Sequence, residues 1–283
     1  MKLPFAVAKR FVAGESLNQA VPKVADLNEY GIKVTLDLLG ENVTDRTMAD
    51  ETLQHYIELL EGIHEQKIDS TISIKLTMLG LDIDRDYCRD NLFKLLDAAV
   101  KYDQFIRIDM EGTDYTQLTI DLFKEAFRKY GKHVGIVIQA YLHRTKDDID
   151  ELSALGADIR LCKGAYNEPE RLALQKMDAI REAYKEYLKV LFDKTVYPRI
   201  ATHDDKLISW VKEYTQQKGI GQSRFEFQML YGMRLDTCKS LAAEGYNVRV
   251  YVPYGTMWFP YFTRRLKERK ENIWFVLSTM FKK

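Results

Sequence analysis

The sequence predicts an α/β protein folded as a single-domain, distorted (β/α)8 barrel, also called a TIM barrel. Eight short runs rich in β-branched and apolar residues recur along the 283 residues. Charged stretches with helical spacing lie between successive runs. Every run also ends in a polar side chain, which is typical of a barrel whose chemistry lies at the carboxyl ends of its strands.

The starts of successive runs lie 22 to 41 residues apart, which is the length of a strand plus a returning helix. The intervening stretches, such as "DNLFKLLDAAVKYD" and "RLALQKMDAIREAYKEYLKVLFDK", repeat apolar residues every three or four positions. Eight such units in a row predict a parallel sheet that closes on itself. In order, the runs are "IKVTLDL" from Ile32, "STISIKLT" from Ser70, "FIRIDME" from Phe105, "VGIVIQAY" from Val134, "ADIRLCKG" from Ala157, "PRIATHD" from Pro198, "FEFQMLYG" from Phe225 and "NVRVYVPYG" from Asn247.

A doubly wound open sheet is the structural alternative. That fold normally has a glycine-rich phosphate loop after its first strand, whereas "LDLLGENVTD" contains only Gly40. Glycine and proline are sparse, at 15 and 6 residues, so no linker divides the chain. We therefore expect one domain over residues 1–283, with an N-terminal extension at 1–30 and a closing helix at 271–283.

Composition excludes several classes of protein. The 42 basic residues equal the 42 acidic ones, which argues against nucleic acid as a partner. Cys88, Cys162 and Cys238 form no CxxC pair, which fits a reducing compartment and gives no thiolate zinc site. The apolar stretch of "MKLPFAVAKRFVAGE" is too short for a signal-peptide core, and no apolar run approaches ~20 residues. We expect a cytoplasmic protein.

Polar residues gather at the ends of the predicted strands, after largely apolar runs. Burying a charged group at one small barrel mouth costs on the order of several kcal/mol in lost hydration, unless the group meets a partner or a ligand. For each residue alone, a salt bridge at the rim is an equally good explanation. The residues are Asp37, Lys75, Asp109 with Glu111, Gln139, Arg160 with Lys163, Thr202 with His203, Glu226 with Gln228, and Tyr251.

The charges at this mouth become net positive once the paired arginines of "PYFTRRLKERKEN" are counted. An anionic ligand, or a cofactor that carries phosphates, would balance them. The alternative is that Arg264 and Arg265 belong to an ordinary solvated helix face. The charged set comprises Lys75, Arg160, Lys163, Arg264 and Arg265 against Asp109, Glu111 and Glu226.

Two further motifs leave several interpretations open. In "RLCKGAYNEP", Lys163 and Gly164 suit a backbone turn around a pyrophosphate, or a plain connection between strand and helix. His203 in "IATHDD" suits a general base, a cofactor contact or a neutral histidine bonded to its neighbours. His55 and His64 are too isolated from carboxylate partners to predict a metal site, and the spacing shows no Ser-His-Asp or Cys-His arrangement.

Residue types alone leave two enzyme classes open. Lys75 and Lys163 at strand ends would suit a Schiff-base lysine aldolase. An arginine near the centre of the mouth would suit a flavin, because the reduced ring is anionic. The residues by themselves predict an enzyme that binds an anion in a barrel.

The quoted stretches, taken in order, resemble the proline dehydrogenase family, flavin enzymes that open proline catabolism. The resemblance runs from about residue 11 to 269 and includes the proline dehydrogenase domain of bifunctional proline utilisation enzymes. It implies a distorted (β/α)8 barrel, FAD as cofactor, L-proline as substrate and a quinone as electron acceptor. The matching stretches are "RFVAGE", "ISIKLT", "IRIDMEG", "IQAYLHRT", "RLCKGAY", "ATHD", "FEFQMLYGMR", "VRVYVPYG" and "YFTRRLKER".

The resemblance also implies a role for each matched residue. Asp109 is the catalytic aspartate, and Arg160 lies beside N5 of the flavin. Lys75, Arg264 and Arg265 would hold the proline carboxylate, while Leu230, Tyr251 and Tyr261 would pack over the proline ring. The cofactor-binding set comprises Met110 through its backbone, Gln139, Arg160, Lys163, Gly164, Ala165, Tyr166, Thr202, His203 and Glu226.

The expected reaction passes a hydride from Cδ of proline to N5 of the flavin and gives 1-pyrroline-5-carboxylate. Two positions depart from the family pattern: Cys162 stands where valine is frequent, and Tyr231 where histidine is often seen. The stretch "YGTMWFPY" is shorter than in the fused enzymes. The tail "ENIWFVLSTMFKK" is expected to pack on its own barrel, and peripheral contact with the inner face of the membrane is the alternative.

Overall fold

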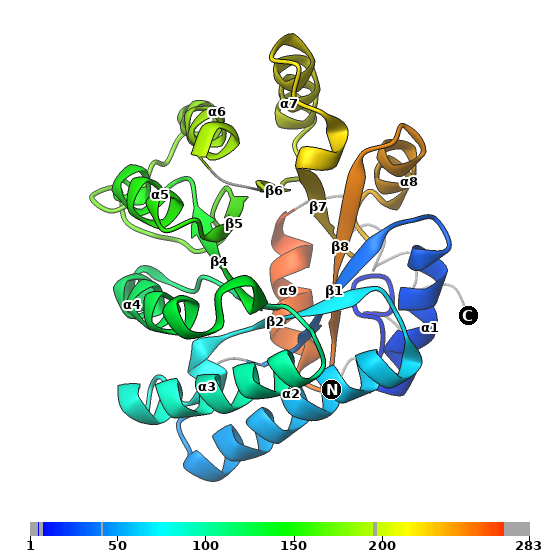
Figure 1. The fold of residues 1–283 in the computed structure, drawn as a ribbon, viewed down its shortest axis with the longest axis vertical. Helices are drawn as coiled ribbons and strands as arrows, with labels where there is room; N and C mark the ends of the chain where they lie inside the picture. The colour runs from blue at the N-terminus through cyan, green and yellow to red at the C-terminus, as the bar shows by residue number, and fades with distance from the viewer. Residues whose placement is uncertain (1–4, 6–7, 41, 195–196, 269–283) are drawn as a thin grey trace.

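The structure is a computed structural model that describes residues 5, 8–40, 42–194 and 197–268, with the backbone alone from residue 264 onward. Within this part, eight parallel strands close into a barrel in chain order (Figure 1). The predicted fold is confirmed, and each strand lies inside its predicted run. The strands are β1 (Lys33–Leu38), β2 (Ser70–Ile74), β3 (Ile106–Ile108), β4 (Val134–Gln139), β5 (Asp158–Cys162), β6 (Arg199–Ala201), β7 (Glu226–Leu230) and β8 (Asn247–Tyr254).

Helices connect the strands, and aspartates cap several of them. Asp45, Asp84 and Asp204 each accept a backbone N–H from the first turn of the helix that follows, which satisfies one of its free donors. The helices are α1 (Leu17–Asn28), α2 (Arg46–Gln66), α3 (Arg85–Lys101), α4 (Thr113–Tyr130), α5 (Thr145–Ala154), α6 (Met177–Lys194), α7 (Asp205–Gln217), α8 (Leu235–Ala243) and α9 (Trp258–Glu268), with short 3-10 turns η2 (Leu76–Leu79), η3 (Gly131–His133) and η4 (Gln222–Arg224).

The strands alternate between an apolar outer face and a polar inner face. Ile72 and Ile74 of β2 are fully buried in the main hydrophobic core. Ser73 lies between them in the strand and points into the barrel, where its hydroxyl accepts a bond from Arg160 on β5, three strands away. The hydrophobic core therefore lies between the strands and the outer helices, while the barrel interior is polar.

Two helices depart from a regular barrel (Figure 1). Helix α9, which follows β8, lies across the centre of the strand ring in this view instead of joining the outer ring. The N-terminal helix α1 packs against β1 and β8 and so occupies the place that the last helix would take. In the described part of the chain, no helix is long and apolar enough to cross a membrane.

The N-terminal segment and α9 together close one end of the barrel through an apolar cluster, here called the mouth cluster. Backbone bonds fasten the segment to the end of β8: Ala13 N to Pro253 O and Gly255 N to Gly14 O, each at 2.9 Å. The predicted division into an extension at 1–30 and a closing helix stays a prediction, since 271–283 lie outside the described residues. The mouth cluster comprises Ala8, Phe11, Val12, Leu39, Met233, Trp258, Tyr261 and Phe262.

Candidate active site

Asp109 is the centre of a hydrogen-bonded group inside the carboxyl end of the barrel. Its Oδ1 accepts bonds from Ser73 Oγ at 3.0 Å and from Arg160 Nη1 at 2.9 Å. Its Oδ2 accepts a bond from the Tyr251 hydroxyl at 2.7 Å. Burial, with the nearby carboxylates, raises the pKa of Tyr251 well above its usual value, so the phenol stays a donor. Donors from three strands, β2, β5 and β8, thus fix the carboxylate that follows β3.

Arg160 lies in β5 with spare capacity to donate. In the part of the chain that the structure describes, it donates through Nη1 alone, to Asp109 and Ser73. Its Nε is buried and has no partner there. The guanidinium also lies over the ring of Tyr251, 5.5 Å from the ring centre. A buried donor without a partner is costly, so this arginine is suited to a ligand that supplies an acceptor.

Lys75 follows β2 and donates to Asp37 Oδ1 at 2.9 Å, with both side chains almost fully buried. Burial alone would lower the pKa of the Lys75 ammonium, but the carboxylates of Asp37 and Asp109 outweigh this and hold the pKa above its usual value. A Schiff-base lysine needs the opposite shift, because its neutral amine is the nucleophile. Lys75 is therefore suited to binding an anion and poorly suited to aldolase chemistry.

Gln139 ends β4 and holds the neighbouring strand end in place. Its Nε2 donates to the backbone oxygen of Glu111 at 2.9 Å, and Thr145 Oγ1 donates to the Gln139 carbonyl at 2.5 Å. The Glu111 carboxylate accepts from Thr77 Oγ1 at 2.6 Å, so it is bonded within the protein. Met110 lies buried between Asp109 and Glu111. Met110 and Gln139 thus lie at the carboxyl end of the barrel, as Asp109 does, and their contact with a cofactor stays a prediction.

The connection after β5 begins with a turn that only glycine can form. Gly164 has φ +119°, and a side chain at this position would lie 2.3 Å from the ring of Tyr141. The loop that follows is fastened to the end of β4 by bonds from Tyr141 N to Lys163 O at 2.9 Å and from Leu174 N to Tyr141 O at 2.7 Å. Ala165 is exposed and Tyr166 half-buried in this loop.

The predicted pyrophosphate lysine is paired with a carboxylate. Lys163 Nζ donates to Asp204 Oδ2 at 2.9 Å, and Arg181 Nε donates to the same oxygen at 2.8 Å. Partial burial alone would raise the pKa of Asp204, but the two cations lower it to about 2. Two cations and one carboxylate therefore meet beside the Gly164 turn.

Thr202 and His203 follow β6 at the same end of the barrel. Thr202 is buried, and its Oγ1 accepts the backbone N–H of Asp204 at 3.1 Å. His203 Nε2 accepts the backbone N–H of Leu230 at 2.9 Å, so its other ring nitrogen carries the proton. That arrangement gives His203 a role in joining β6 to β7 and leaves the general-base interpretation without support.

The predicted substrate-packing residues lie at the mouth. Leu230 ends β7 and packs on the mouth cluster, of which Tyr261 on α9 is a buried member. The backbones of Arg264 and Arg265 continue α9 beyond Tyr261. Their side chains lie outside the described residues, so their contact with a substrate stays a prediction.

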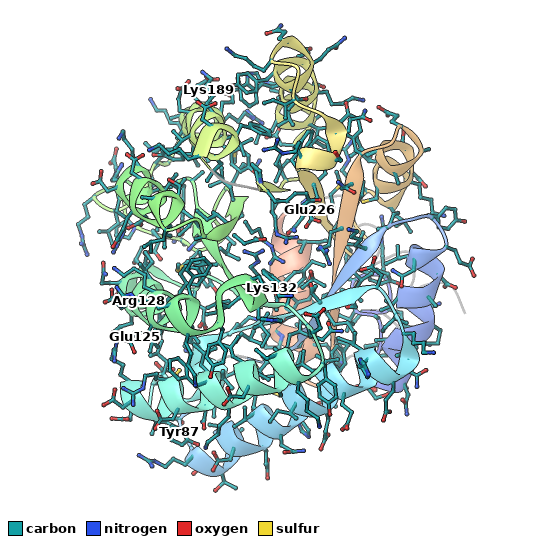
Figure 2. All side chains as sticks on the ribbon, in the orientation of Figure 1. Tyr87, Glu125, Arg128, Lys132, Lys189 and Glu226 are labelled. Carbon is teal, nitrogen blue, oxygen red and sulfur yellow. The ribbon has the colours of Figure 1, made fainter. Side chains whose placement is uncertain are left out.

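Glu226 is not at the mouth, and its predicted position at a strand end is wrong. It is the first residue of β7 and lies at the amino end of the barrel, inside the strand ring, whereas Lys189 and Arg128 lie on the outer helices (Figure 2). Its Oε1 accepts from Arg199 Nη1 at 2.7 Å and from Arg249 Nε at 2.9 Å. The base network, as we call this group, consists of Arg107, Asp158, Arg199, Glu226, Gln228 and Arg249.

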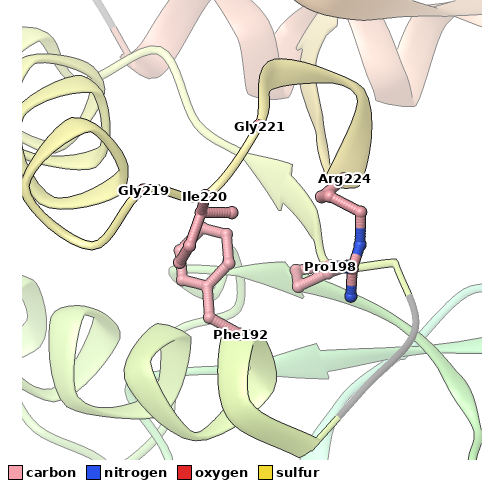
Figure 3. A pocket seen from close by; sticks show the side chains of 6 residues that line it. All are labelled: Phe192, Pro198, Gly219, Ile220, Gly221 and Arg224. Carbon is pink, nitrogen blue, oxygen red and sulfur yellow. The ribbon is translucent and has the colours of Figure 1, made fainter.

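Two open cavities lie away from the Asp109 group. One of about 180 Å³ lies beside the starts of β6 and β7, with Arg224 across from Phe192 (Figure 3). The other, of about 280 Å³, lies between α1 and α8. The first has one charged lining residue, and neither cavity is lined by a residue of the mouth, so neither is the candidate active site. The described residues also contain no group of His, Cys, Asp and Glu side chains that could hold a metal.

Sequence reasoning missed three residues of the site, Ser73, Arg181 and Asp204, and also the pairing of Asp37 with Lys75. Alternation along β2 could have found Ser73, because it lies two residues before Lys75 and so shares its face. Arg181 and Asp204 meet only through the packing of two connecting segments, and no local sequence signal marks that contact.

A family model and two similar proteins carry the same description. Residues 20–277 match a family model described as proline dehydrogenase. The chain is 44% identical over 276 residues to Proline dehydrogenase 2 of Bacillus subtilis, covering 98% of this chain and 91% of that protein. It is 39% identical over 280 residues to Proline dehydrogenase of Deinococcus radiodurans, covering 98% and 90%.

A solved structure is similar in fold as well. The crystal structure of proline utilization A from Bdellovibrio bacteriovorus, inactivated by N-propargylglycine, superimposes with a TM-score of 0.87 at 26% identity. The match covers 93% of this chain and 33% of that one, so this chain spans about a third of that protein.

Proposed function

The chain belongs to the proline dehydrogenase family of oxidoreductases, and we propose that it oxidises L-proline to 1-pyrroline-5-carboxylate with bound FAD. The observation that carries the proposal is the group at the barrel mouth, where Asp109 holds Arg160 and Tyr251 beside the Lys75–Asp37 pair. The relatives named as proline dehydrogenases support the same substrate. The reaction would be the first step of proline catabolism to glutamate.

The residues of the mouth fit a flavin dinucleotide. The buried Arg160 Nε lacks an acceptor among the described residues, and a flavin ring offers oxygen and nitrogen acceptors. Lys163 and Gly164 would hold the pyrophosphate at the turn after β5, where the positive φ of Gly164 brings the backbone close. Met110, Gln139, Thr202 and His203 lie around these groups on neighbouring strand ends, and Ala165 and Tyr166 continue the turn.

Lys75 would bind the carboxylate of proline together with Arg264 and Arg265 of α9. Asp37 and Asp109 keep the Lys75 ammonium charged, and only one of its three donors is used by Asp37. Two guanidinium forks would fix the carboxylate in one orientation, which a single ammonium cannot do. Leu230, Tyr251 and Tyr261 would then enclose the ring, and the mouth cluster would exclude water.

Asp109 has two tasks in the proposed mechanism. Its carboxylate fixes the positions of Arg160 and Tyr251, and its negative charge would attract the secondary ammonium of proline. The proton that this ammonium loses before oxidation would pass to water while the mouth is still open. When bound, FAD would supply the hydride acceptor: the hydride would leave Cδ of proline for N5 of the flavin, and the C=N bond of the product would form. Arg160 would stabilise the negative charge that develops on the acceptor.

We further propose that a quinone removes the electrons and that the enzyme works in the cytoplasm. The support is the family resemblance. Residues 273–281 carry the apolar side chains that would contact a membrane surface, and they lie outside the described residues. Flotation of the full chain with liposomes, against a chain truncated at Asn272, tests the membrane contact: equal flotation would exclude a role for this segment.

The cofactor itself is tested by the absorption spectrum of the purified protein. We expect a yellow protein whose visible absorption is that of a bound flavin. Borohydride treatment in the presence of a carbonyl substrate should trap no adduct on Lys75. A colourless protein that FAD cannot reconstitute would contradict the proposal, and a trapped lysine would favour an aldolase.

A further inference from the structure

Asp204 is shared by two cations that are held in different ways. Lys163 Nζ and Arg181 Nε both donate to its Oδ2, at 2.9 and 2.8 Å. Arg181 also donates through Nη1 to Asp178 at 2.7 Å, so two carboxylates fix its planar fork. Lys163 has one carboxylate partner and the thioether of Met177 at 3.6 Å. Lys163 is therefore the cation that can leave.

Asp204 cannot follow Lys163 if the lysine moves. Its Oδ1 caps α7 by accepting the backbone N–H of Lys206 at 3.1 Å, and its own N–H donates to Thr202 Oγ1 at 3.1 Å. Its side chain is 7% exposed. A carboxylate that is fixed and nearly buried must keep a counter-ion, because leaving it unpaired costs far more than the pair gains.

The neighbouring charges leave Arg181 as the counter-ion. Arg234 also acts electrostatically on Asp204, but its guanidinium bonds to Asp205 at 2.5 Å and to the His203 carbonyl at 2.8 Å. Arg181 bonds to Asp204 directly, at 2.8 Å. The ammonium of Lys163 is a point charge on a flexible stem, which suits a group that exchanges one anion for another.

We propose that Arg181 is the permanent counter-ion of Asp204, which lets Lys163 leave this carboxylate and bind the phosphate groups of FAD. The inference rests on the proposed function, because it takes FAD as the ligand. Arg181 is a positioning residue in this account: it acts through Asp204 and Lys163 and does not touch the cofactor. Without Arg181, Asp204 would compete with the phosphates for Lys163.

The test is the affinity for FAD, measured by flavin fluorescence during titration and during release from the holoprotein. We expect Arg181→Gln to weaken binding about tenfold, the effect of one charged hydrogen bond. Arg181→Lys should restore affinity to within about threefold, since a lysine also neutralises Asp204. Arg89→Gln is the matched control, because Arg89 likewise bonds carboxylates on its own helix, and it should bind FAD as the unaltered protein does.

A double variant separates this role from a merely structural one. Asp204→Asn removes the competing charge but keeps a good helix cap. Combined with Arg181→Gln, it should return FAD affinity to that of the unaltered protein. Unchanged affinity in Arg181→Gln, or a double variant as weak as the single one, would overturn the inference. If the unaltered protein failed to bind FAD, the proposed function itself would fall.

Discussion

The two ends of the barrel both bury charged side chains, but they use them differently. At the base, Arg199 bonds to Asp158 and Glu226 through three of its nitrogens, and Arg249 bonds to Glu226 and to a backbone carbonyl. At the mouth, Arg160 donates through one nitrogen and Lys75 has one carboxylate partner. The base network is nearly satisfied by the protein, whereas the mouth keeps donors for a ligand.

This difference separates stability from function. A closed network of buried charges strongly resists the loss of one member, because the others are left without partners. A group with spare donors gives up part of that stabilisation so that a substrate or cofactor can complete it. We therefore expect substitutions at the base to change the free energy of unfolding, and substitutions at the mouth to change catalysis.

The largest effect is expected at the base, for Glu226→Gln. Losing this charge leaves the buried Arg249 without its carboxylate partner and Arg199 with Asp158 alone. It should lower the free energy of unfolding by about 3–5 kcal/mol, measured by chemical denaturation. Turnover per folded molecule should be unchanged. Asp103→Asn is the control, since Asp103 pairs with Lys132 at an exposed site, where the change should stay within about 0.5 kcal/mol.

At the mouth, Asp109→Asn should lower turnover by about 10²–10³-fold, because an amide no longer offsets the charge of Arg160 or attracts the proline ammonium. The free energy of unfolding should fall less than in Glu226→Gln, because Asp109 pairs with one arginine whereas Glu226 pairs with two. Tyr251→Phe removes only the bond to Oδ2 and should lower turnover less, by about tenfold. An Asp109→Asn enzyme that unfolds as readily as Glu226→Gln would show that the mouth is also part of the structural frame.

Arg265→Met should raise KM for proline by about 10–100-fold while FAD stays bound, since it removes one fork from the proposed carboxylate site. Steady-state kinetics with proline measure this change. Arg128→Met, on the exposed surface of α4, serves as the matched control. An unchanged KM in Arg265→Met would show that Arg265 does not bind the proline carboxylate.

The smallest expected effect is the change in the free energy of unfolding at acidic pH. The arginines hold the pKa of Asp158 and of Glu226 below their usual values, although burial alone would raise them. Unfolded carboxylates take up protons near pH 4, and these folded ones do so only at lower pH, so the unfolded state binds more protons in that range. Stability should therefore fall as pH drops from about 5 to 3. A Glu226→Gln protein should show a shallower fall, and an identical slope would contradict the assignment.

The sequence predicts the strands well because each one alternates an apolar outer face with a polar inner one. It does not predict how far along the barrel each polar residue lies. Glu226, Gln228 and Leu230 share one face of β7, and the run "FEFQMLYG" does not show that the first of them lies at the base. Asp109 and Lys75 directly follow β3 and β2, whereas Arg160 is the middle residue of β5 and reaches the same group through its bond to Asp109. The contact of Arg181 with Asp204 depends on tertiary packing and has no local signal.

Anaerobic addition of L-proline to the FAD-loaded protein tests the central claim most directly. We expect the visible absorption of the oxidised flavin to be lost as 1-pyrroline-5-carboxylate forms in an amount equal to the flavin, and we expect Asp109→Asn to slow this step. A flavin that binds but stays oxidised in the presence of proline would contradict it.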